Sequence, residues 1–385
     1  MITNERQFIL DSLRTALLGK ADRLTVWRTA EALDTKTIVR IIQQNGILLT
    51  VFPVLAEFPE IQNALHNLYY CELAHAISQD HEGKQILHAL NDTGLNCIAL
   101  KGWKLRRLYP NINMRQMADL DILVRPYDFR VIKETMLSLG YSAGNVESSW
   151  KHDNFSKGTV KVEMHKRLTD DSGPIRDWEH RMWQHALPSG EGAHILRMSV
   201  EDFFIFHIVH MYKDFLNGSL GLRRIADTWL LTHAHPDMDR AHLAEAFDRM
   251  GLSLFAERMI ALGKATMGET ELDENSEIML AHAFEHGIYG SDKSYKAGRI
   301  TAMGSSLKMG KIRSALTAVF LPVGRMKAQY PVLEKYPILL PYYWLRRIKR
   351  FLGGNRYKYR RMLDYSNIND ADFAEMKHFL EVGGA

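Results

Sequence analysis

The chain has 385 residues, 46% hydrophobic and 24% charged, with a formal net charge of +4. This composition is ordinary for a globular protein and excludes an intrinsically disordered chain, while the length predicts more than one structural unit. The first twenty residues alternate charged and apolar side chains at helical spacing, so we expect a helix of the fold and not a signal peptide. The most apolar run, "GILLTVFPVLAEF", is interrupted by Pro53 and falls short of the roughly 18 to 20 residues that cross a bilayer. No transmembrane segment is therefore predicted.

Residues 1–90 are predicted to form a helical N-terminal region. Apolar residues recur at spacings of three and four in "RQFILDSLRTALL", "TKTIVRIIQQNG" and "LHNLYYCELAHAISQ", which is typical of amphipathic helices. The last of these segments contains Cys71, which like Cys97 has apolar neighbours and no zinc-type spacing. We therefore expect two buried thiols and a reducing, cytoplasmic environment.

Residues 91–198 mix strand and helix patterns. "LNCIALKG" and "ADLDILV" are short apolar runs of the buried strand type, separated by a helical "WKLRRLYP" and a loop. Pro126 starts a predicted helix that Gly140 closes, and two further extended runs end in "GTVKVEMHKRL". Amphipathic helices then return, and we expect a helical bundle over 199–290 and a basic helical region over 291–385. The predicted fold class is α+β, with a small mixed sheet between a helical N-terminal region and a C-terminal helical bundle.

Two aspartates open the strand "ADLDILV". Asp119 and Asp121 are two residues apart, so both side chains project from the same face of the strand. Two carboxylates held a few ångströms apart cannot both stay ionised cheaply unless a cation lies between them, and Mg²⁺ prefers carboxylate oxygens. The pair therefore indicates a divalent metal site. The alternative is the solvated end of a strand, since a single Asp-x-Asp sequence is common.

A third acid follows on a later strand. In "TVKVEMHKRL" apolar and polar residues alternate, which puts Glu163 and His165 on the polar side. If this strand pairs beside the first, Glu163 lies on the face of the two aspartates. Three acids can bind two metal ions about 3.5 to 4 Å apart, which clamp the attacking and leaving oxygens of an in-line phosphoryl displacement.

The ordered series "ALKG", "RQMADLDILV" and "KVEMHKRL" resembles the nucleotidyltransferase superfamily related to DNA polymerase β, specifically its bacterial branch of uncharacterised nucleotidyltransferases. The branch signature is Lys-Gly, then Arg-x-x-x-Asp-h-Asp-h-Leu-Val, then a strand with Glu-x-His. The matching residues are Lys101, Gly102, Arg115, Asp119, Asp121, Glu163 and His165. The resemblance continues to "FLPVGRMKAQYPVLEKYPILLPYYWLRRIKRFL" and so covers most of the chain. It implies a nucleotidyltransferase core over 91–198, in which both aspartates bind two metal ions and Glu163 holds the catalytic one.

One residue departs from the wider superfamily. The parent signature has Gly-Ser or Gly-Gly, whose backbone and hydroxyl hold the triphosphate, whereas Gly102 is followed here by Trp103. Tryptophan cannot donate as a hydroxyl does, so Lys101 is expected to take over part of the phosphate contact. The other cations predicted to neutralise a triphosphate are Arg115, Lys213 and Arg223.

Two helices after the sheet carry further candidates. His207 and His210 are three residues apart on one predicted helix, but no third ligand at diagnostic spacing is visible, so we do not expect zinc there. Arg223 and Asp227 are four residues apart on the next helix and could form an ion pair. This pair is either a surface salt bridge or part of the triphosphate pocket, and the resemblance favours the pocket.

The C-terminal region concentrates positive charge. Between Lys293 and Arg361 there are 17 Lys or Arg and one acid, Glu334, so the other residues together carry about −12. Such a segment needs an anionic partner. "YPILLPYYWLRRIKRFLGGNRYKYRR" mixes aromatic, aliphatic and basic residues, as interfacial elements do. Three interpretations stay open: docking onto the acidic remainder of the protein, binding to an anionic membrane face, or binding to a polyanionic substrate.

We therefore expect a cytoplasmic enzyme, with peripheral membrane attachment as an option. It would transfer a nucleoside monophosphate group from a nucleoside triphosphate, with ATP favoured, to a hydroxyl-bearing acceptor and release pyrophosphate. Two Mg²⁺ or Mn²⁺ ions are the expected cofactors. The acceptor is not identified by the sequence. The alternatives are a non-catalytic nucleotide-binding protein and a membrane-peripheral assembly protein.

Overall fold

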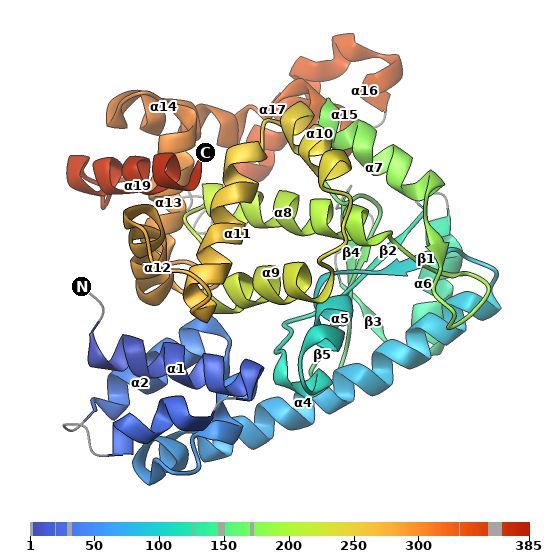
Figure 1. Ribbon diagram of the computed structural model, residues 1–385. Helices are drawn as coiled ribbons and strands as arrows, with labels where there is room; N and C mark the ends of the chain where they lie inside the picture. The colour runs from blue at the N-terminus through green and yellow to red at the C-terminus, as the bar shows by residue number, and fades with distance from the viewer. Residues whose placement is uncertain are drawn as a thin grey trace.

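The predicted α+β class is confirmed by a computed structural model of the chain, in which one seven-stranded sheet is surrounded by helices (Figure 1). The N-terminal helices, the sheet and the later helices form adjoining parts of one molecule. The structure describes residues 3–19, 21–28, 33–125, 128–144, 151–169, 173–330, 332–352 and 364–385.

The N-terminal region is helical, as its apolar spacing predicts. The elements are α1 (Asn4–Leu18), η1 (Ala21–Arg28), α2 (Thr35–Asn45), α3 (Leu48–Val51), η2 (Phe52–Val54) and α4 (Pro59–Asp92). The side chain of Thr3 accepts a hydrogen bond from the backbone N–H of Arg6 and caps α1, which ends at Gly19 in the left-handed conformation. No single helix in the described ranges is long and apolar enough to cross a membrane. The helical segments Thr35–Asn45 and Leu48–Val54 are together long and apolar enough, but the chain bends by 117° between them.

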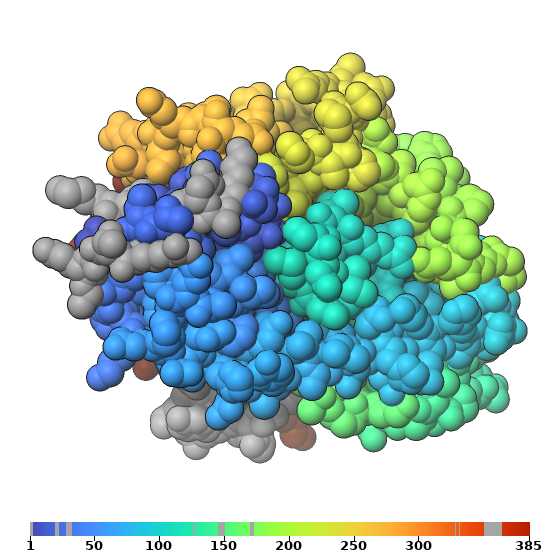
Figure 2. Space-filling view, turned by 60° about the horizontal axis from the view of Figure 1, so that its bottom comes forward, coloured from blue at the N-terminus to red at the C-terminus, as the bar shows by residue number. Residues whose placement is uncertain are grey.

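Helix α4 spans 34 residues and runs along the sheet, forming a band across the face seen in Figure 2. Ile86, Leu87 and Leu90 on this helix are buried in the sheet's own hydrophobic cluster. The prediction of a buried Cys71 is wrong, because this residue lies on the solvent side of α4, whereas Cys97 is buried as expected. One side of so long a helix remains in water, and apolar neighbours in the sequence do not reveal which side.

The sheet has the order β3-β4-β5-β2-β1-β7-β6 and is mixed. The pairs β2–β5 and β1–β7 are parallel, and the other neighbouring pairs are antiparallel. The strands are β1 (Cys97–Ala99), β2 (Leu120–Val124), β3 (Ser142–Ala143), β4 (His152–Lys157), β5 (Val160–His165), β6 (Leu187–Pro188) and β7 (Ile195–Arg197). All five residues of β2 are buried, including its aspartate, and β2 and β5 lie at the centre of the order.

Short helices connect the strands. They are α5 (Lys101–Leu105), η3 (Arg106–Leu108), η4 (Ile112–Met114), α6 (Phe129–Ser138) and α7 (Pro174–Gln184). The expected helix start at Pro126 lies outside the described residues. Gly140 follows α6 with a φ of 82°, in the left-handed region that favours glycine, so the predicted closing residue has the expected conformation.

Helices form most of the described residues after β7. They are α8 (Val200–Leu216), α9 (Leu222–Ala234), α10 (Arg240–Met250), α11 (Ser253–Met267), α12 (Glu274–His286), α13 (Asp292–Met303), α14 (Leu307–Val319), α15 (Val323–Gln329), α16 (Val332–Lys335), η6 (Pro337–Leu339), α17 (Leu340–Leu352) and α19 (Asp370–Gly383). The larger hydrophobic cluster joins the N-terminal helices to these later helices, with Phe8, Phe255 and Phe379 all fully buried within it. Helices α8 and α9 contribute buried residues to this cluster, which also reaches Ile98 and Leu123 of the sheet.

Candidate active site

Three carboxylates meet at the centre of the sheet. Strands β2 and β5 pair in parallel with Asp121 directly opposite Glu163, which confirms the expected pairing of these strands. Asp119 lies one residue before β2. Each of the three offers an oxygen, and these oxygens all lie within 4.8 Å of one another. The structure thus brings together the three acids singled out by the sequence.

Two basic side chains contact Asp121, which is 5% exposed. Lys101 Nζ and His165 Nε2 each lie 2.7 Å from its Oδ1. Burial opposes ionisation of this carboxyl, but the charge of Lys101 and the hydrogen bond from His165 outweigh it and hold the pKa of Asp121 well below its usual value. Asp121 is therefore an anion at neutral pH.

Asp119 responds in the opposite direction. Burial, with the charge of Asp121 adding to it, raises the pKa of Asp119 to about 6. The pKa of Glu163 is lowered, chiefly by its hydrogen bond from His165. The three acids thus form a site in which the pKa of one member is raised by burial and a like charge, as expected of ligands that gather around a cation.

The turn after β1 aims Lys101 at this site. Among the described residues other than glycine, Lys101 alone has a positive φ, 37°. The backbone N–H of Leu100 donates to the carbonyl of Asp121 over 2.9 Å and fixes the turn against β2. A Cβ on the following residue, Gly102, would lie 2.5 Å from Nη1 of Arg115 and 2.7 Å from Cγ of Met117. Close packing therefore favours glycine at position 102. The strained backbone of Lys101 directs its side chain to the carboxylates.

Arg115 forms a buried ion pair with Asp227 of α9. Its Nε and Nη2 donate to the two carboxylate oxygens over 2.8 and 2.7 Å, and the hydroxyl of Tyr109 donates to Oδ1 over 2.9 Å. Burial opposes both charges, but each partner stabilises the other, so the pKa of Asp227 is lowered and that of Arg115 raised. The ion pair of Asp227 is therefore with Arg115, and not with Arg223 as its spacing had suggested.

Arg223 reaches a different partner. Its Nη1 donates to the backbone carbonyl of Gln116 over 2.7 Å. A Cβ on Gly46 would lie 2.9 Å from this nitrogen, so the glycine that ends α2 also makes room for the guanidinium. Desolvation lowers the pKa of this arginine.

A cavity of about 210 Å³ opens beside the carboxylates. Its lining includes six of the residues singled out by the sequence, namely Lys101, Gly102, Arg115, Asp119, Asp121 and Arg223. Lys213 and Glu163 line an adjoining cavity of about 160 Å³ with Lys151, His152 and His165. Lys101 and His210 border both cavities. The predicted residues therefore divide between two spaces that meet near Lys101.

The histidines of α8 make local contacts. Nε2 of His207 lies 2.8 Å from the hydroxyl of Thr228, and burial lowers the pKa of His207 to about 4. Nδ1 of His210 lies 3.3 Å from a carboxylate oxygen of Asp214, and burial keeps the pKa of His210 well below its usual value. Both rings border the first cavity as neutral groups.

Sequence reasoning missed several residues near the site. It named Asp227 but did not identify Arg115 as its partner, and it did not single out Tyr289 and Arg224, which line the first cavity. His152 lies opposite His165 across the antiparallel pair β4–β5, with its Nε2 3.5 Å from Oε1 of Glu163. The alternation of side chains along β4 indicates which face His152 lies on. Predicting its approach to Glu163 also requires the register of β4 on β5.

The donor set fits a hard divalent cation. Three carboxylates offer oxygens within 4.8 Å of one another, and Mg²⁺ and Mn²⁺ prefer such oxygen ligands. Asp119, Asp121 and Glu163 are the residues that would hold them.

The comparisons with known proteins gave one match. A family model described as "Uncharacterised nucleotidyltransferase" matches residues 31–268. This range includes the three carboxylates and the lining of both cavities except Ile288 and Tyr289. Curated proteins and solved structures yielded no match.

Proposed function

The chain belongs to the uncharacterised nucleotidyltransferase family and is a transferase of phosphorus-containing groups, and we propose that it moves a nucleoside monophosphate from a nucleoside triphosphate to a hydroxyl-bearing acceptor. Pyrophosphate is the second product. The bond from the α-phosphorus to the oxygen that bridges it to the β-phosphorus breaks, and a bond from the acceptor oxygen to the α-phosphorus forms. The hydroxyl proton of the acceptor passes to Glu163 and from there to solvent.

The convergence of three carboxylates carries this proposal. Asp119, Asp121 and Glu163 offer oxygens within 4.8 Å of one another on two neighbouring strands, beside a cavity lined with cations. Two Mg²⁺ or Mn²⁺ ions bound there would supply charge stabilisation to the attacking and leaving oxygens. The protein's own contribution is to hold the three acids on rigid strands, so that the ligand geometry exists before substrate arrives.

The first cavity suits the triphosphate. Lys101, Arg115 and Arg223 line it, and each is fixed by a hydrogen bond to Asp121, Asp227 or the Gln116 carbonyl. Cations held by rigid partners stabilise a polyphosphate without reorganising when the reaction occurs. Arg115 acts while paired with Asp227, which orients its guanidinium but leaves the pair without net charge. ATP is the favoured donor.

The second cavity suits the acceptor. Glu163 borders it, and the lowered pKa of Glu163 keeps this carboxylate able to accept a proton or bind a cation near neutral pH. Lys151 and Lys213 line the same space. We expect Lys213, first considered for the triphosphate, to act at the junction of donor and acceptor.

The direct test uses the purified protein with each α-labelled nucleoside triphosphate, Mg²⁺ or Mn²⁺ and a cell extract. The expected result is a labelled acceptor together with pyrophosphate, and the Asp119→Asn variant controls for self-labelling. Metal-dependent binding of nucleotide with no transfer to any acceptor across several extracts would overturn the proposed reaction and favour the non-catalytic nucleotide-binding alternative.

The basic C-terminal region supports a second proposal, that the enzyme attaches to an anionic membrane surface. Tyr342 and Leu345 of α17 are 58% and 66% exposed, and the adjacent Arg346 and Lys349 are exposed as well. Their spacing of three and four residues puts them on one outward face of the helix. Several basic residues near residue 360 lie outside the described ranges. A cytoplasmic location with peripheral attachment follows from this proposal.

A further inference from the structure

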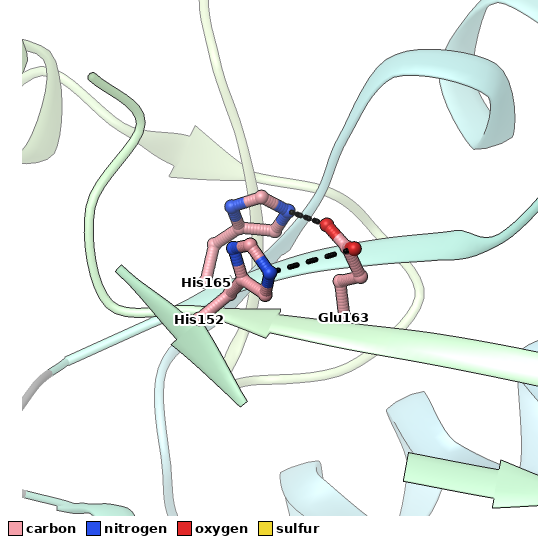
Figure 3. Close-up of side chains that lie close together, drawn as sticks. All are labelled: His152, Glu163 and His165. Carbon is pink, nitrogen blue, oxygen red and sulfur yellow. Dashed lines mark ion pairs between the residues drawn. The ribbon is translucent and has the colours of Figure 1, made fainter. Parts of the chain in front are cut away.

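Two histidines and a glutamate meet on the edge of the carboxylate site that faces the second cavity. His152 of β4 and His165 of β5 are directly opposite each other in the antiparallel register, and Glu163 projects beside them (Figure 3). Nε2 of His152 lies 3.5 Å from one oxygen of Glu163, and Nε2 of His165 lies 3.3 Å from the other. The ligand atoms of these three residues all lie within 4.8 Å of one another.

These separations match those around a transition metal. Zinc is bound by histidine nitrogen and carboxylate oxygen at about 2.0 to 2.1 Å, so two of its ligands in a tetrahedral site lie about 3.3 Å apart. The donor set of two imidazoles and one carboxylate favours Zn²⁺ over Mg²⁺, which prefers oxygen ligands alone. The three side chains also line a cavity, which gives an ion a path to them.

We propose that His152, Glu163 and His165 form a second metal site, selective for zinc-class ions, which overlaps the site made by the three carboxylates. Glu163 belongs to both sites. A zinc ion bound to the histidines withdraws this carboxylate from Asp119 and Asp121, so that zinc occupancy and magnesium occupancy compete.

The contacts around His165 allow zinc to bind without leaving Asp121 unpaired. His165 must give up its hydrogen bond to Asp121 when its Nε2 binds a metal. Asp121 still has Lys101 Nζ at 2.7 Å, so this buried carboxylate keeps a cationic partner.

The surroundings of His165 limit the affinity of this site for a metal ion. A histidine bound through Nε2 carries its proton on Nδ1, and Nδ1 of His165 is buried without a hydrogen-bond partner among the described residues. Metal-binding histidines normally donate that proton, and loss of such a partner costs about 10- to 100-fold in metal affinity. We therefore expect micromolar, reversible binding, as suits a site that senses or inhibits and not a permanent structural one.

Cobalt and zinc titrations of the whole protein test the site directly. We expect one Co²⁺ per chain to give visible absorption bands of a four-coordinate nitrogen and oxygen site, with Zn²⁺ displacing it. His152→Ala should weaken the tight binding at least about 10-fold. The matched control is His194→Ala, which removes a half-buried histidine bonded to Asn96 and corrects for background binding by the other histidines. Asp119→Asn should retain the site, because Asp119 is no ligand of it.

Equal metal affinity in His152→Ala and His194→Ala would overturn the proposal, as would the absence of any Co²⁺ site in the protein. Metal binding does not depend on the proposed transfer reaction, but its inhibitory effect does. If turnover is established, micromolar Zn²⁺ should inhibit it and added Mg²⁺ should relieve the inhibition, with a higher inhibition constant in His152→Ala. A protein that binds Co²⁺ as expected but transfers no nucleotide would contradict only the reaction.

Discussion

Arg115 and Asp227 are 112 residues apart in the sequence, yet their side chains form a two-pronged ion pair that ties the loop before β2 to α9. The side chain of Asp227 is 1% exposed and that of Arg115 is 9% exposed. The pair lies in the wall of the cavity proposed for the triphosphate. There Asp227 of the rigid helix α9 holds the guanidinium of Arg115 in position. A buried pair of this kind contributes more to geometry than to net stability, because the desolvation of two charges offsets much of their attraction.

Removing one partner should nevertheless destabilise the fold. Asp227→Asn leaves the buried Arg115 charge without its counterion, and we expect a loss of about 3 kcal/mol in the free energy of unfolding. Urea denaturation followed by circular dichroism measures it. Glu245→Gln is the control, since its pair with Arg249 has side chains about 60% exposed and should lose less than about 1 kcal/mol. Equal stability of the two variants would contradict the assignment of Asp227 as the buried anchor.

The positive φ of Lys101 predicts that glycine stabilises this position relative to alanine, the reverse of the usual order in a helix. Glycine usually destabilises a helix relative to alanine by roughly 0.5 to 1 kcal/mol. At a φ of 37° the order should invert, because alanine has a Cβ in the left-handed region and glycine does not. We expect Lys101→Gly to unfold at a higher urea concentration than Lys101→Ala. Both variants lose the ammonium, so their difference reports the backbone alone.

The proposed chemistry predicts a loss of activity without loss of folding. Asp121→Asn or Glu163→Gln should reduce kcat by roughly 10²- to 10⁴-fold, because each removes a metal-binding anion while keeping the side-chain volume. Glu134→Gln, in an exposed pair with Arg130, is the matched control and should leave turnover unchanged. Circular dichroism checks that all three variants fold. Undiminished turnover in either site variant would remove that residue from the metal site.

Local signals in the sequence identified the three carboxylates, whereas their proximity depended on an expected strand pairing that the structure confirms. The alternation of side chains in "ADLDILV" and "TVKVEMHKRL" fixes which residues share a face, and the parallel pairing of β2 and β5 then brings Asp121 beside Glu163. The fold class followed for the same reason, because helix and strand periods are local properties of the chain.

Long-range partners could not be predicted in this way. The sequence offered Asp227 an arginine four residues away, but Arg223 instead reaches the carbonyl of Gln116 past Gly46, and Arg115 takes its place. That choice depends on how α2, α9 and the loop before β2 pack, which no spacing records. His152 was missed for a related reason, because its approach to Glu163 requires the register of β4 on β5.

A buried histidine outside the site predicts acid sensitivity. His282 of α12 stacks on Phe379 and has Nε2 3.0 Å from the carbonyl of Gly218, and burial lowers the pKa of His282 to about 3. The unfolded chain binds a proton at this residue near pH 6.5 and the folded chain does not, so stability falls as the pH drops below 6.5.

Substitution of this histidine should remove part of that dependence. The difference in unfolding free energy between the wild type and His282→Gln should shrink by roughly 2.7 kcal/mol between pH 7.5 and 4.5. Urea denaturation at a series of pH values measures it, with His180→Gln, an exposed residue of α7, as the control for the change in charge. A difference that is constant with pH would show that His282 does not resist protonation.

Substitutions on the outward face of α17 should distinguish internal docking of this helix from membrane binding. Arg347 on this helix points inward and donates to the carbonyl of Ala318 over 3.2 Å, so internal docking uses one side of α17 and leaves Arg346 and Lys349 outward. Each basic residue near an anionic surface contributes about 1 kcal/mol, so Arg346→Gln with Lys349→Gln should weaken binding to phosphatidylserine vesicles about 30-fold and reduce its salt dependence.

Leu345→Asp should weaken vesicle binding further, because Leu345 is 66% exposed and has its apolar side chain directed outward beside these charges. Leu254→Asp on α11, where the native leucine is 50% exposed outside the basic region, is the control and should bind vesicles like the wild type. Co-sedimentation at two salt concentrations measures both variants. If neutralising Arg346 and Lys349 leaves co-sedimentation unchanged, α17 does not bind lipid, and the charge of this face must then serve a soluble polyanion or a partner protein.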